Sequence, residues 1–419
     1  MGGGIGRAIS DSLIAEKKMT PDVHEVYCLE RPVNFQYVEK CLTNSIEVKY
    51  ALSGEDLYRE MSQTDIVVIH WWNHPAMAQL LLNFPVIRTR VVFWIHVSGC
   101  TYPKLPFSLV EYMDYTIFTT PYTYKNPHWN EEEQEIAEKK GSVIYGLGEL
   151  RDICLKKSYE VGEEFVIGYV GTIHTSKLHP DIALFCREVK LNIPNTKFVF
   201  VGENLLDCNT MNQINNLGLL DAVELTGYVN DVEAQLQRFD VFGYPLNPYH
   251  YGSTENALLE PMSAGIPVVA LNHGAERSII CDGVNGLLAD NPQQYGECMA
   301  ELFESKELRG RLGRNAASFV KEEYNLYKNI ECLNHLLLKV CLITPKIYDF
   351  QEIFGREPHE YFLSCMGSER KFFENDTLKL KKEDLPIILK GYSKGSVHQF
   401  AEYFVEDEIL KKWAEELNA

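Results

Sequence analysis

The sequence predicts an α/β protein with two domains, each built on a parallel sheet. Its 419 residues suffice for two domains of ordinary size and an extension. Short apolar runs alternate with helical patterns along most of the chain, as is typical of βαβ units. Asp65–His70 (DIVVIH) and Val91–His96 (VVFWIH) are apolar almost throughout, which predicts strands buried on both faces of a sheet.

The predicted first domain covers residues 1–155. It begins with a glycine-rich stretch, in which Gly3 and Gly4 are expected to form a loop before a helix at Ala8–Lys18. A doubly wound domain has a strand before such a loop, and that strand is missing here; the alternative is a disordered start. The other expected strands are Val23–Leu29, Ile46–Tyr50, Asp65–His70, Val91–His96, Tyr115–Thr119 and Ser142–Tyr145, with helices at Gly54–Met61 and Ala76–Leu82.

The predicted second domain covers residues 156–335, and residues 336–419 are expected to form a helical C-terminal extension. The extension contains two helical patterns, 350–365 and 397–417, around a charged middle. Contact with the first domain, an oligomer interface and acceptor recognition are all open as its role. The expected elements of the second domain are strands at Glu164–Val170, Lys197–Val201, Val223–Leu225 and Phe239–Pro245, and helices at Pro292–Ser305 and Glu307–Glu322.

Composition limits the partners and the compartment. The net charge is −19, from 40 basic and 59 acidic residues, which argues against broad nucleic-acid binding. Eleven scattered cysteines without a C-x-x-C pair are simplest as reduced thiols of a cytoplasmic protein. No signal peptide and no apolar run long enough to span a membrane is expected. A peripheral contact with the inner face of a membrane stays open, as does a homo-oligomer.

The stretch Tyr251–Ala270 is predicted to form a loop, a helix and a short strand. Ser253 or Thr254 is expected to cap the helix, and Gly265 and Pro267 to end it. A loop that leads into a helix N-terminus can bind an anion, because unpaired N–H groups face the ligand. The alternative is that this is the repeating unit of any α/β protein, since most such loops bind nothing.

The amino-acid sequence of this stretch resembles the donor-site segment of retaining glycosyltransferase family 4, the group 1 glycosyltransferases, which have the GT-B fold. Leu258–Glu260, Ala264–Gly265 and Pro267–Val269 match the family. Its members carry two glutamates eight residues apart; Glu260 matches the second, whereas Gly252 stands at the first, with Glu255 nearby but out of register. The resemblance implies two Rossmann-like domains facing a cleft and a nucleoside-diphosphate-sugar donor.

A second match is the loop Gly171–Lys177. It resembles the family's G-R-x4-K loop, in which arginine and lysine hold the donor diphosphate; Lys177 matches the lysine, and Thr172 replaces the arginine. Without the resemblance, Lys177 would be interpreted as a solvated lysine on a polar loop. With it, Lys177 is expected to neutralise the diphosphate without a metal.

The resemblance implies further roles. Lys177, Glu255 and His96 are the expected catalytic residues, with Glu255 on the donor sugar and His96 orienting donor or acceptor. Glu260, a carboxylate on an apolar helix, is expected to bind the ribose diol. The full set of expected donor-binding residues is Gly3, Gly4, Gly171, Thr172, Lys177, Tyr228, Val229, Gly252, Ser253, Thr254, Glu255, Asn256 and Glu260.

Other residues at strand ends are weaker candidates. His70, Trp71 and His74 are expected to contact the acceptor, with the alternative that a histidine here is structural and that the tryptophan fills the core. No histidine pair has metal-ligand spacing, so no metal is expected, and no cofactor beyond the donor.

The predicted function is transfer of a sugar, of hexosyl type, from a nucleoside diphosphate to an acceptor hydroxyl with retention of configuration. The acceptor is left open among a sugar or polysaccharide, a lipid-linked sugar, a protein and a small molecule. One alternative is a non-catalytic homologue that acts as a binding subunit, favoured by Thr172, Gly252 and the missing strand. Another is a different GT-B reaction, such as epimerisation or phosphorolysis. A dehydrogenase is disfavoured, because no G-x-G-x-x-G loop follows a strand.

Overall fold

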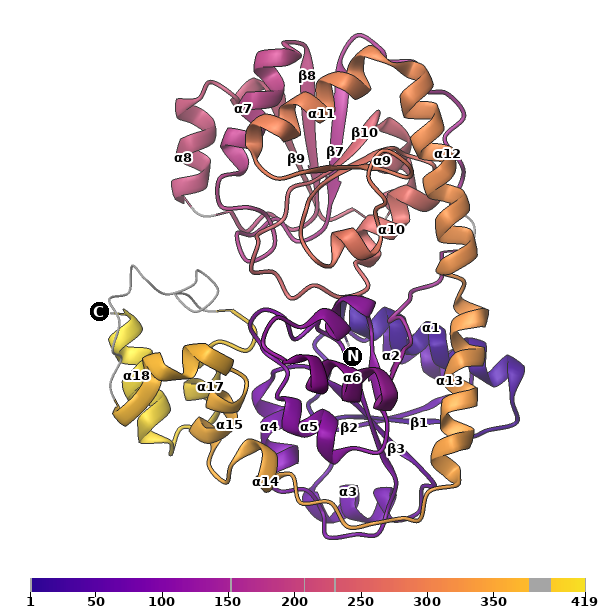
Figure 1. Cartoon of the computed structure of the whole chain (residues 1–419), viewed down its shortest axis with the longest axis vertical. Helices are drawn as coiled ribbons and strands as arrows, with labels where there is room; N and C mark the ends of the chain where they lie inside the picture. The colour runs from indigo at the N-terminus through magenta and orange to yellow at the C-terminus, as the bar shows by residue number, and fades with distance from the viewer. Residues whose placement is uncertain (1, 151–152, 207, 230, 377–392, 419) are drawn as a thin grey trace. The chain divides into compact units, whose positions relative to one another are not determined.

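The computed structural model describes residues 2–150, 153–206, 208–229, 231–376 and 393–418 (Figure 1). The chain forms two compact units. The first holds the residues up to 149, residues 251–254 and the residues from 326 onward; the second holds residues 150–250 and 255–325. Residues 377–392, in the middle of the predicted extension, lie outside the described residues. Both units are built on parallel sheets, which confirms the predicted α/β class.

The second unit has one six-stranded parallel sheet in the order β12-β11-β10-β7-β8-β9. The order reverses between β7 and β10, which makes this pair the topological switch point where such sheets bind ligands at the carboxyl ends of their strands. Every strand expected here is present. The strands are β7 (Phe165–Val170), β8 (Thr196–Val201), β9 (Val223–Gly227), β10 (Val241–Tyr244), β11 (Val268–Leu271) and β12 (Leu287–Ala289).

Helices cover this sheet. In Figure 1, α11 lies beside α7, and the two helices pack together. Another packed pair is α10 and α12. The helices of the second unit are α7 (Ile182–Asn192), α8 (Cys208–Asn216), α9 (Val232–Arg238), α10 (Asn256–Ser263), α11 (Pro292–Glu304) and α12 (Lys306–Glu323), with 3-10 turns η2 (Leu220–Ala222) and η3 (Glu276–Ser278).

The first unit has two parallel sheets. Four strands pair in sequence order, β3 (Val67–Trp71), β4 (Val91–Ile95), β5 (Thr116–Phe118) and β6 (Gly141–Val143), and a separate pair consists of β1 (Glu25–Cys28) and β2 (Glu47–Tyr50). Its helices before residue 150 are α1 (Gly3–Met19), α2 (Gln36–Thr43), α3 (Gly54–Met61), α4 (Pro75–Leu82), α5 (Phe107–Tyr112) and α6 (Glu131–Lys140), with the 3-10 turn η1 (Pro121–Lys125). After the second unit, the chain returns to the first unit with a long helix, α13 (Leu326–Cys341).

The glycine-rich start is not a loop. Helix α1 begins at Gly3, so Gly3 and Gly4 form its exposed first turn, and Gly6 N–H donates to the Gly2 carbonyl at 3.1 Å. The helix is fastened farther along, because Arg7 Nη2 donates to the Glu149 carbonyl and the Asp11 carboxylate accepts from Glu149 N–H, both at 2.8 Å. These contacts explain why the start is helical. Among the described residues, no strand precedes α1.

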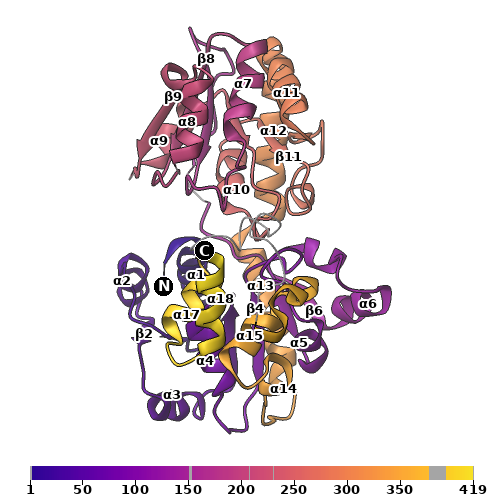
Figure 2. The ribbon, with the colours of Figure 1, turned by 90° about the vertical axis from the view of Figure 1, so that its left-hand side faces the viewer.

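The C-terminal residues complete the first unit. Figure 2 shows α15, α17 and α18 clustered beside α4, and α15 and α17 pack on that helix. Aromatic side chains bury this contact, among them Tyr361, Phe400 and Trp413. Of the roles left open for the extension, contact with the first unit is therefore present. The elements are α14 (Gln351–Phe354), α15 (Pro358–Ser364), η4 (Gly367–Asp376), α17 (Val397–Tyr403) and α18 (Glu408–Asn418).

The two helices expected in the extension are each divided. Gly355, with φ +85°, ends α14 before α15 begins. Asp407 Oδ1 accepts from the N–H groups of Ile409 and Leu410, so a new N-terminus starts between α17 and α18. The apolar pattern with helical period continues through both of these points. Such a pattern does not reveal where the backbone changes direction, so each pair of helices was predicted as one.

The buried Glu16 carboxyl on α1 makes stability pH-dependent. Glu16 is 1% exposed, and burial, with the nearby Asp22 carboxylate, raises its pKa from 4.5 to about 7. The folded state therefore binds this proton more tightly than the unfolded chain does. Stability from this group is fully present below pH 4.5 and is lost as pH rises through 7. The loss amounts to roughly 3 kcal/mol, at about 1.4 kcal/mol per pKa unit.

Glu16→Gln is accordingly expected to raise the Tm at pH 8 and to change it little at pH 5, because a neutral amide has no charge to bury. Thermal unfolding followed by circular dichroism at the two pH values measures this. Glu39→Gln, at an exposed position on α2, serves as the control. An equal Tm shift at both pH values would contradict the assignment.

Candidate active site

A lysine and a glutamate from distant parts of the chain meet at the switch point of the second unit. Lys177 ends the loop that follows β7, and Glu255 immediately precedes α10. Lys177 Nζ donates to Glu255 Oε2 at 2.7 Å. The structure thus brings together two of the three predicted catalytic residues.

The segment after β10 holds the Lys177 loop in place. Asn247 N–H donates to the Lys177 carbonyl at 2.8 Å, and Asn247 Nδ2 donates to the Thr175 carbonyl at 2.7 Å. Leu178 and Leu246 form an isolated antiparallel bridge beside them. These main-chain contacts fix where the Lys177 side chain starts, which leaves the position of its ammonium to the side chains around it.

Glu255 is a buried anion with several donors. It is 4% exposed, and its Oε2 accepts from the Tyr244 hydroxyl at 2.5 Å in addition to Lys177. Burial raises the pKa of the Glu255 carboxyl, but the charges of Lys177 and His250 and the hydrogen bonds from Lys177 and Tyr244 outweigh it and lower the pKa to about 2. Glu255 is therefore ionised at neutral pH and fixes an ammonium at the strand ends.

The start of α10 differs from the expectation. Glu255 itself stands at the N-cap, in the left-handed conformation with φ +52°, and its own side chain makes no capping hydrogen bond. Thr254 does not cap α10, because its hydroxyl donates to the Thr119 carbonyl and accepts from Gly146 N–H, both at 2.9 Å. Gly252, Ser253 and Thr254 belong to the first unit. The predicted capping by Thr254 was therefore wrong, because its hydroxyl bonds within the first unit, and capping by Ser253 stays a prediction.

The remainder of that segment folds as expected. Gly265, with φ +74°, follows the last turn of α10, and its N–H donates to the Met262 carbonyl at 3.0 Å. Glu260 is half-buried on α10, and Asn256 is its first residue. The expected strand is β11, parallel to β10 and β12.

The other predicted donor contacts lie on the loops of the second unit. Gly171 N–H donates to the Val201 carbonyl at 2.9 Å, and the carbonyl of exposed Thr172 accepts from the Tyr169 hydroxyl at 3.1 Å. Tyr228, after β9, is 76% exposed, with Val229 next to it. Their parts in donor binding stay predictions, as do those of Gly3 and Gly4.

Two buried residues beside Glu255 were not predicted. His250 Nδ1 lies 3.7 Å from Glu255 Oε1, and His250 Nε2 lies 3.1 Å from Oε1 of Glu276, which is 0% exposed. One atom from each of the three residues falls within 4.8 Å of the others, a spacing that a metal ion could use. A glutamate three residues before the apolar pair Ile279–Ile280 was a signal in the sequence.

The histidines of the first unit form their own pair. His70 Nδ1 and His96 Nε2 are 2.8 Å apart, and both rings stack with Trp94. Burial lowers the pKa of His70 to about 4, and burial together with His70 lowers the pKa of His96 well below its usual value. Both rings are therefore neutral near pH 7, which suits hydrogen bonding to a hydroxyl rather than neutralisation of a phosphate.

The weaker acceptor candidates are structural where the contacts are defined. Trp71 is 0% exposed, and its Nε1 donates to the Tyr361 hydroxyl at 3.1 Å, so the predicted acceptor contact of Trp71 was wrong: the ring fills the core. His74 caps α4 by accepting from Ala76 N–H at 3.2 Å, which favours the structural alternative for that residue. An α/β strand end carries both core and ligand-facing side chains, and the sequence does not separate them.

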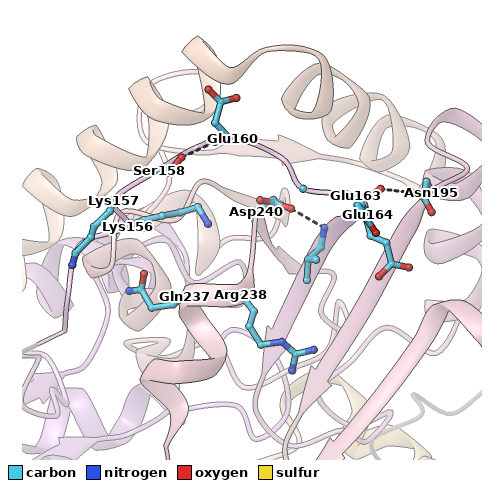
Figure 3. A pocket seen from close by; sticks show the side chains of 12 residues that line it. Lys156, Lys157, Ser158, Glu160, Glu163, Glu164, Asn195, Gln237, Arg238 and Asp240 are labelled. Atoms are coloured by element: carbon cyan, nitrogen blue, oxygen red, sulfur yellow. Dashed lines mark hydrogen bonds between the residues drawn. The ribbon is translucent and has the colours of Figure 1, made fainter.

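A hollow of about 800 Å³ lies elsewhere in the second unit (Figure 3). It is at the amino ends of β7, β8 and β10, the opposite edge from Lys177. Its polar groups are occupied: Lys156 Nζ donates to the Phe239 carbonyl at 2.7 Å, and Asp240 Oδ2 accepts from Val166 N–H at 2.9 Å. Because parallel sheets bind ligands at their carboxyl ends, the candidate site is the edge with Lys177 and Glu255 rather than this hollow.

One segment of the chain matches the model of a known protein family. Residues 152–319 match the model of the family described as "Glycosyl transferases group 1". The matched segment makes up most of the second unit. It contains Lys177, Glu255 and Glu260, together with His250 and Glu276.

Individual relatives are similar to part of this chain. The chain is 30% identical to spore coat protein SA of Bacillus subtilis over 206 residues, 45% of this chain and 48% of the relative. It is 24% identical to alpha-D-kanosaminyltransferase of Streptomyces kanamyceticus over 180 residues, 42% of this chain and 46% of that enzyme. The chain thus spans less than half of the length of these curated relatives.

A solved structure has the fold of most of this chain. Anabaena Alr3699/HepE, in complex with UDP and glucose, superposes with a TM-score of 0.63 at 15% identity, covering 80% of this chain and 96% of that one. The two units together have the predicted GT-B fold. In the described part of the chain, no helix combines the length and the apolarity needed to cross a bilayer.

Proposed function

We propose that this protein is a glycosyltransferase that moves a sugar from a nucleoside-diphosphate-sugar to an acceptor hydroxyl. The observation that carries the proposal is the ammonium of Lys177, held by the buried Glu255 carboxylate where β7 and β10 diverge. A fixed cation at the carboxyl ends of a parallel sheet suits a diphosphate. The family match of residues 152–319 and the nucleotide bound by Alr3699/HepE support the same donor class.

The chemistry follows from where charge develops. The bond between the anomeric carbon and the diphosphate oxygen breaks, the acceptor oxygen bonds to that carbon, and the acceptor proton passes to the departing phosphate. Negative charge therefore grows on the diphosphate, and Lys177 stabilises it. We further propose retention of configuration and a hexosyl donor, as the family resemblance implies, with transfer that needs no metal.

We propose that the acceptor is a hydroxyl group of a sugar, whether that sugar is free, lipid-linked or part of a polysaccharide. The neutral pair of His70 and His96 offers hydrogen bonds to hydroxyl groups in the first unit. We place the reaction in the cytoplasm, where nucleotide sugars are the expected donors.

A thermal-shift screen with UDP-, GDP-, ADP- and dTDP-sugars tests the donor class. A donor present at about 100 times its Kd stabilises the folded protein by roughly 2.7 kcal/mol, so the correct base is expected to raise the Tm clearly. Product analysis with that donor then identifies the sugar. No shift with any of the four would contradict the proposal and favour a homologue that does not catalyse transfer.

Glu260→Ala is expected to weaken donor binding about 10- to 100-fold, because a hydrogen bond to a charged group contributes about 1.5–3 kcal/mol. Half-buried Glu260 lies on the surface of α10, so the fold should survive. Titration calorimetry with the donor found by the screen measures the loss. Glu301→Ala, an exposed glutamate on α11, is the control, and unchanged affinity in Glu260→Ala would remove Glu260 from the site.

A further inference from the structure

Behind the Lys177–Glu255 pair lies a second buried carboxyl group, that of Glu276. Glu276 is 0% exposed, and among the described residues no hydrogen bond of good geometry reaches either of its carboxylate oxygens. Taking an ionised carboxylate out of water costs several kcal/mol unless a cation compensates it. A basic group beside it is the ring of His250, whose Nε2 lies 3.1 Å from Glu276 Oε1.

The His250 ring stands between two glutamates. Its Nε2 faces Glu276, and its Nδ1 faces Glu255 Oε1 at 3.7 Å. The other oxygen of Glu255, Oε2, is the one that accepts from Lys177 and Tyr244. The two oxygens of Glu255 thus have different neighbours, and the ring on the Oε1 side restricts rotation of the carboxylate.

Four side chains follow one another in a mostly buried row: Lys177, Glu255, His250 and Glu276. Two carboxylates alternate with one ammonium and one imidazole, which donates from both nitrogens when protonated. All except Lys177 are less than 5% exposed, so their mutual attraction is weakly screened. Removal of one charge leaves its neighbour uncompensated, and the next side chain in the row is then free to move.

We propose that His250 and Glu276 are positioning residues: together they hold the Glu255 carboxylate in the orientation that places the Lys177 ammonium for the donor diphosphate. The proposal rests on the proposed function for its last step, the use of Lys177 by a diphosphate. Its structural step, the fixing of Lys177, is independent of any ligand.

The geometry favours this arrangement over a metal site made from the same residues. A histidine ligates a metal through one nitrogen, whereas the His250 nitrogens face two different carboxylates. The Lys177 ammonium at 2.7 Å from Glu255 also competes with a second cation. The prediction that the protein holds no metal is unchanged.

The first test measures how accessible the Lys177 amine is, by competitive acetylation with acetic anhydride at pH 8 and mass spectrometry of peptides. Exposed Lys157 in the same unit is the internal reference. Glu276→Gln and His250→Gln are each expected to raise acetylation of Lys177 relative to Lys157 by at least about threefold, as the paired ammonium becomes free. Glu276→Asp, which keeps the charge, should give a smaller rise.

A matched control is His273→Gln. The His273 ring lies 6.0 Å from that of His250, but its Nε2 faces the Leu246 carbonyl rather than lying between carboxylates. Its substitution should leave Lys177 acetylation unchanged. If either His250→Gln or Glu276→Gln does not fold, the other carries the test. Equal Lys177 acetylation in folded Glu276→Gln and the wild type would overturn the proposal, as would a wild-type Lys177 that is as reactive as Lys157.

The second test uses inorganic pyrophosphate in titration calorimetry, because it presents a diphosphate without a base or a sugar. Glu276→Gln is expected to weaken its binding about tenfold, with the effect falling on KM for the donor more than on kcat in a transfer assay. If the wild type binds neither pyrophosphate nor any nucleotide sugar, the proposed function fails, while the acetylation result still decides whether the positioning row exists. Pyrophosphate affinity that is equal in both proteins would overturn the final step.

Discussion

Lys177→Ala is expected to lower kcat/KM for the donor at least about 100-fold, because the alanine removes the cation that meets charge on the departing diphosphate. It should also destabilise the second unit. Glu255 is 4% exposed and would lose its ammonium partner, and an uncompensated buried charge costs about 3–5 kcal/mol. Donor turnover and thermal unfolding, measured on the same preparation, separate the two effects.

Paired variants show which effect dominates. Lys177→Ala combined with Glu255→Gln removes both charges and should recover most of the lost stability without restoring turnover. Lys177→Arg keeps the charge and should retain part of the activity. Lys157→Ala, at an exposed position in the same unit, controls for the loss of a lysine. Full turnover in a folded Lys177→Ala protein would disprove the assignment of the site.

Gly168→Ala is expected to destabilise the protein by about 3 kcal/mol, near the upper range for overpacking of a core. Gly168 lies in β7, at the centre of the six-stranded sheet, where it pairs with Val199 and Phe242. A Cβ at this position would lie 2.1 Å from the ring of Phe239, which is 0% exposed and cannot move aside. Urea unfolding measures the loss.

Gly162→Ala is the matched control, since a Cβ there meets no atom within 4 Å. The double variant Gly168→Ala with Phe239→Ala tests the cause. If the clash with the ring is responsible, the cost of Gly168→Ala should largely disappear in the Phe239→Ala background. A Gly168→Ala protein as stable as the Gly162→Ala control would show that the core yields at this point.

The elements of the fold could be predicted because each leaves a local pattern. Runs such as Asp65–His70 and Val91–His96 are apolar because parallel strands are covered on both faces, and β3 and β4 formed there. Gly265 ended α10 because a residue with φ +74° is readily supplied by glycine. Local patterns failed where the backbone turns, as at Gly355 and Asp407 in the C-terminal region.

The site was predicted only in part. The resemblance of the sequence to a glycosyltransferase family predicted Lys177, Glu255 and Glu260 as site residues. In the structure, Lys177 and Glu255 form a direct hydrogen bond. No sequence pattern indicated that Lys177 and Glu255 would pair, because 78 positions separate them and no periodicity connects two loops. His250 and Glu276 were missed for the same reason: a buried charge is recognised by its surroundings.

Two expectations failed because they treated neighbours in the chain as neighbours in space. Ser253 or Thr254 was expected to cap α10, yet the Thr254 hydroxyl bonds to Thr119 and Gly146 of the first unit. Trp71 was expected at an acceptor site, yet its ring is covered by α15, almost 300 residues later. The sequence by itself determined the α/β class, the strands and the resemblance to group 1 glycosyltransferases, since these depend on residue type and spacing along the chain. Only the tertiary structure decided which charges meet, because burial and the pairing of charges are set by the packing of distant segments.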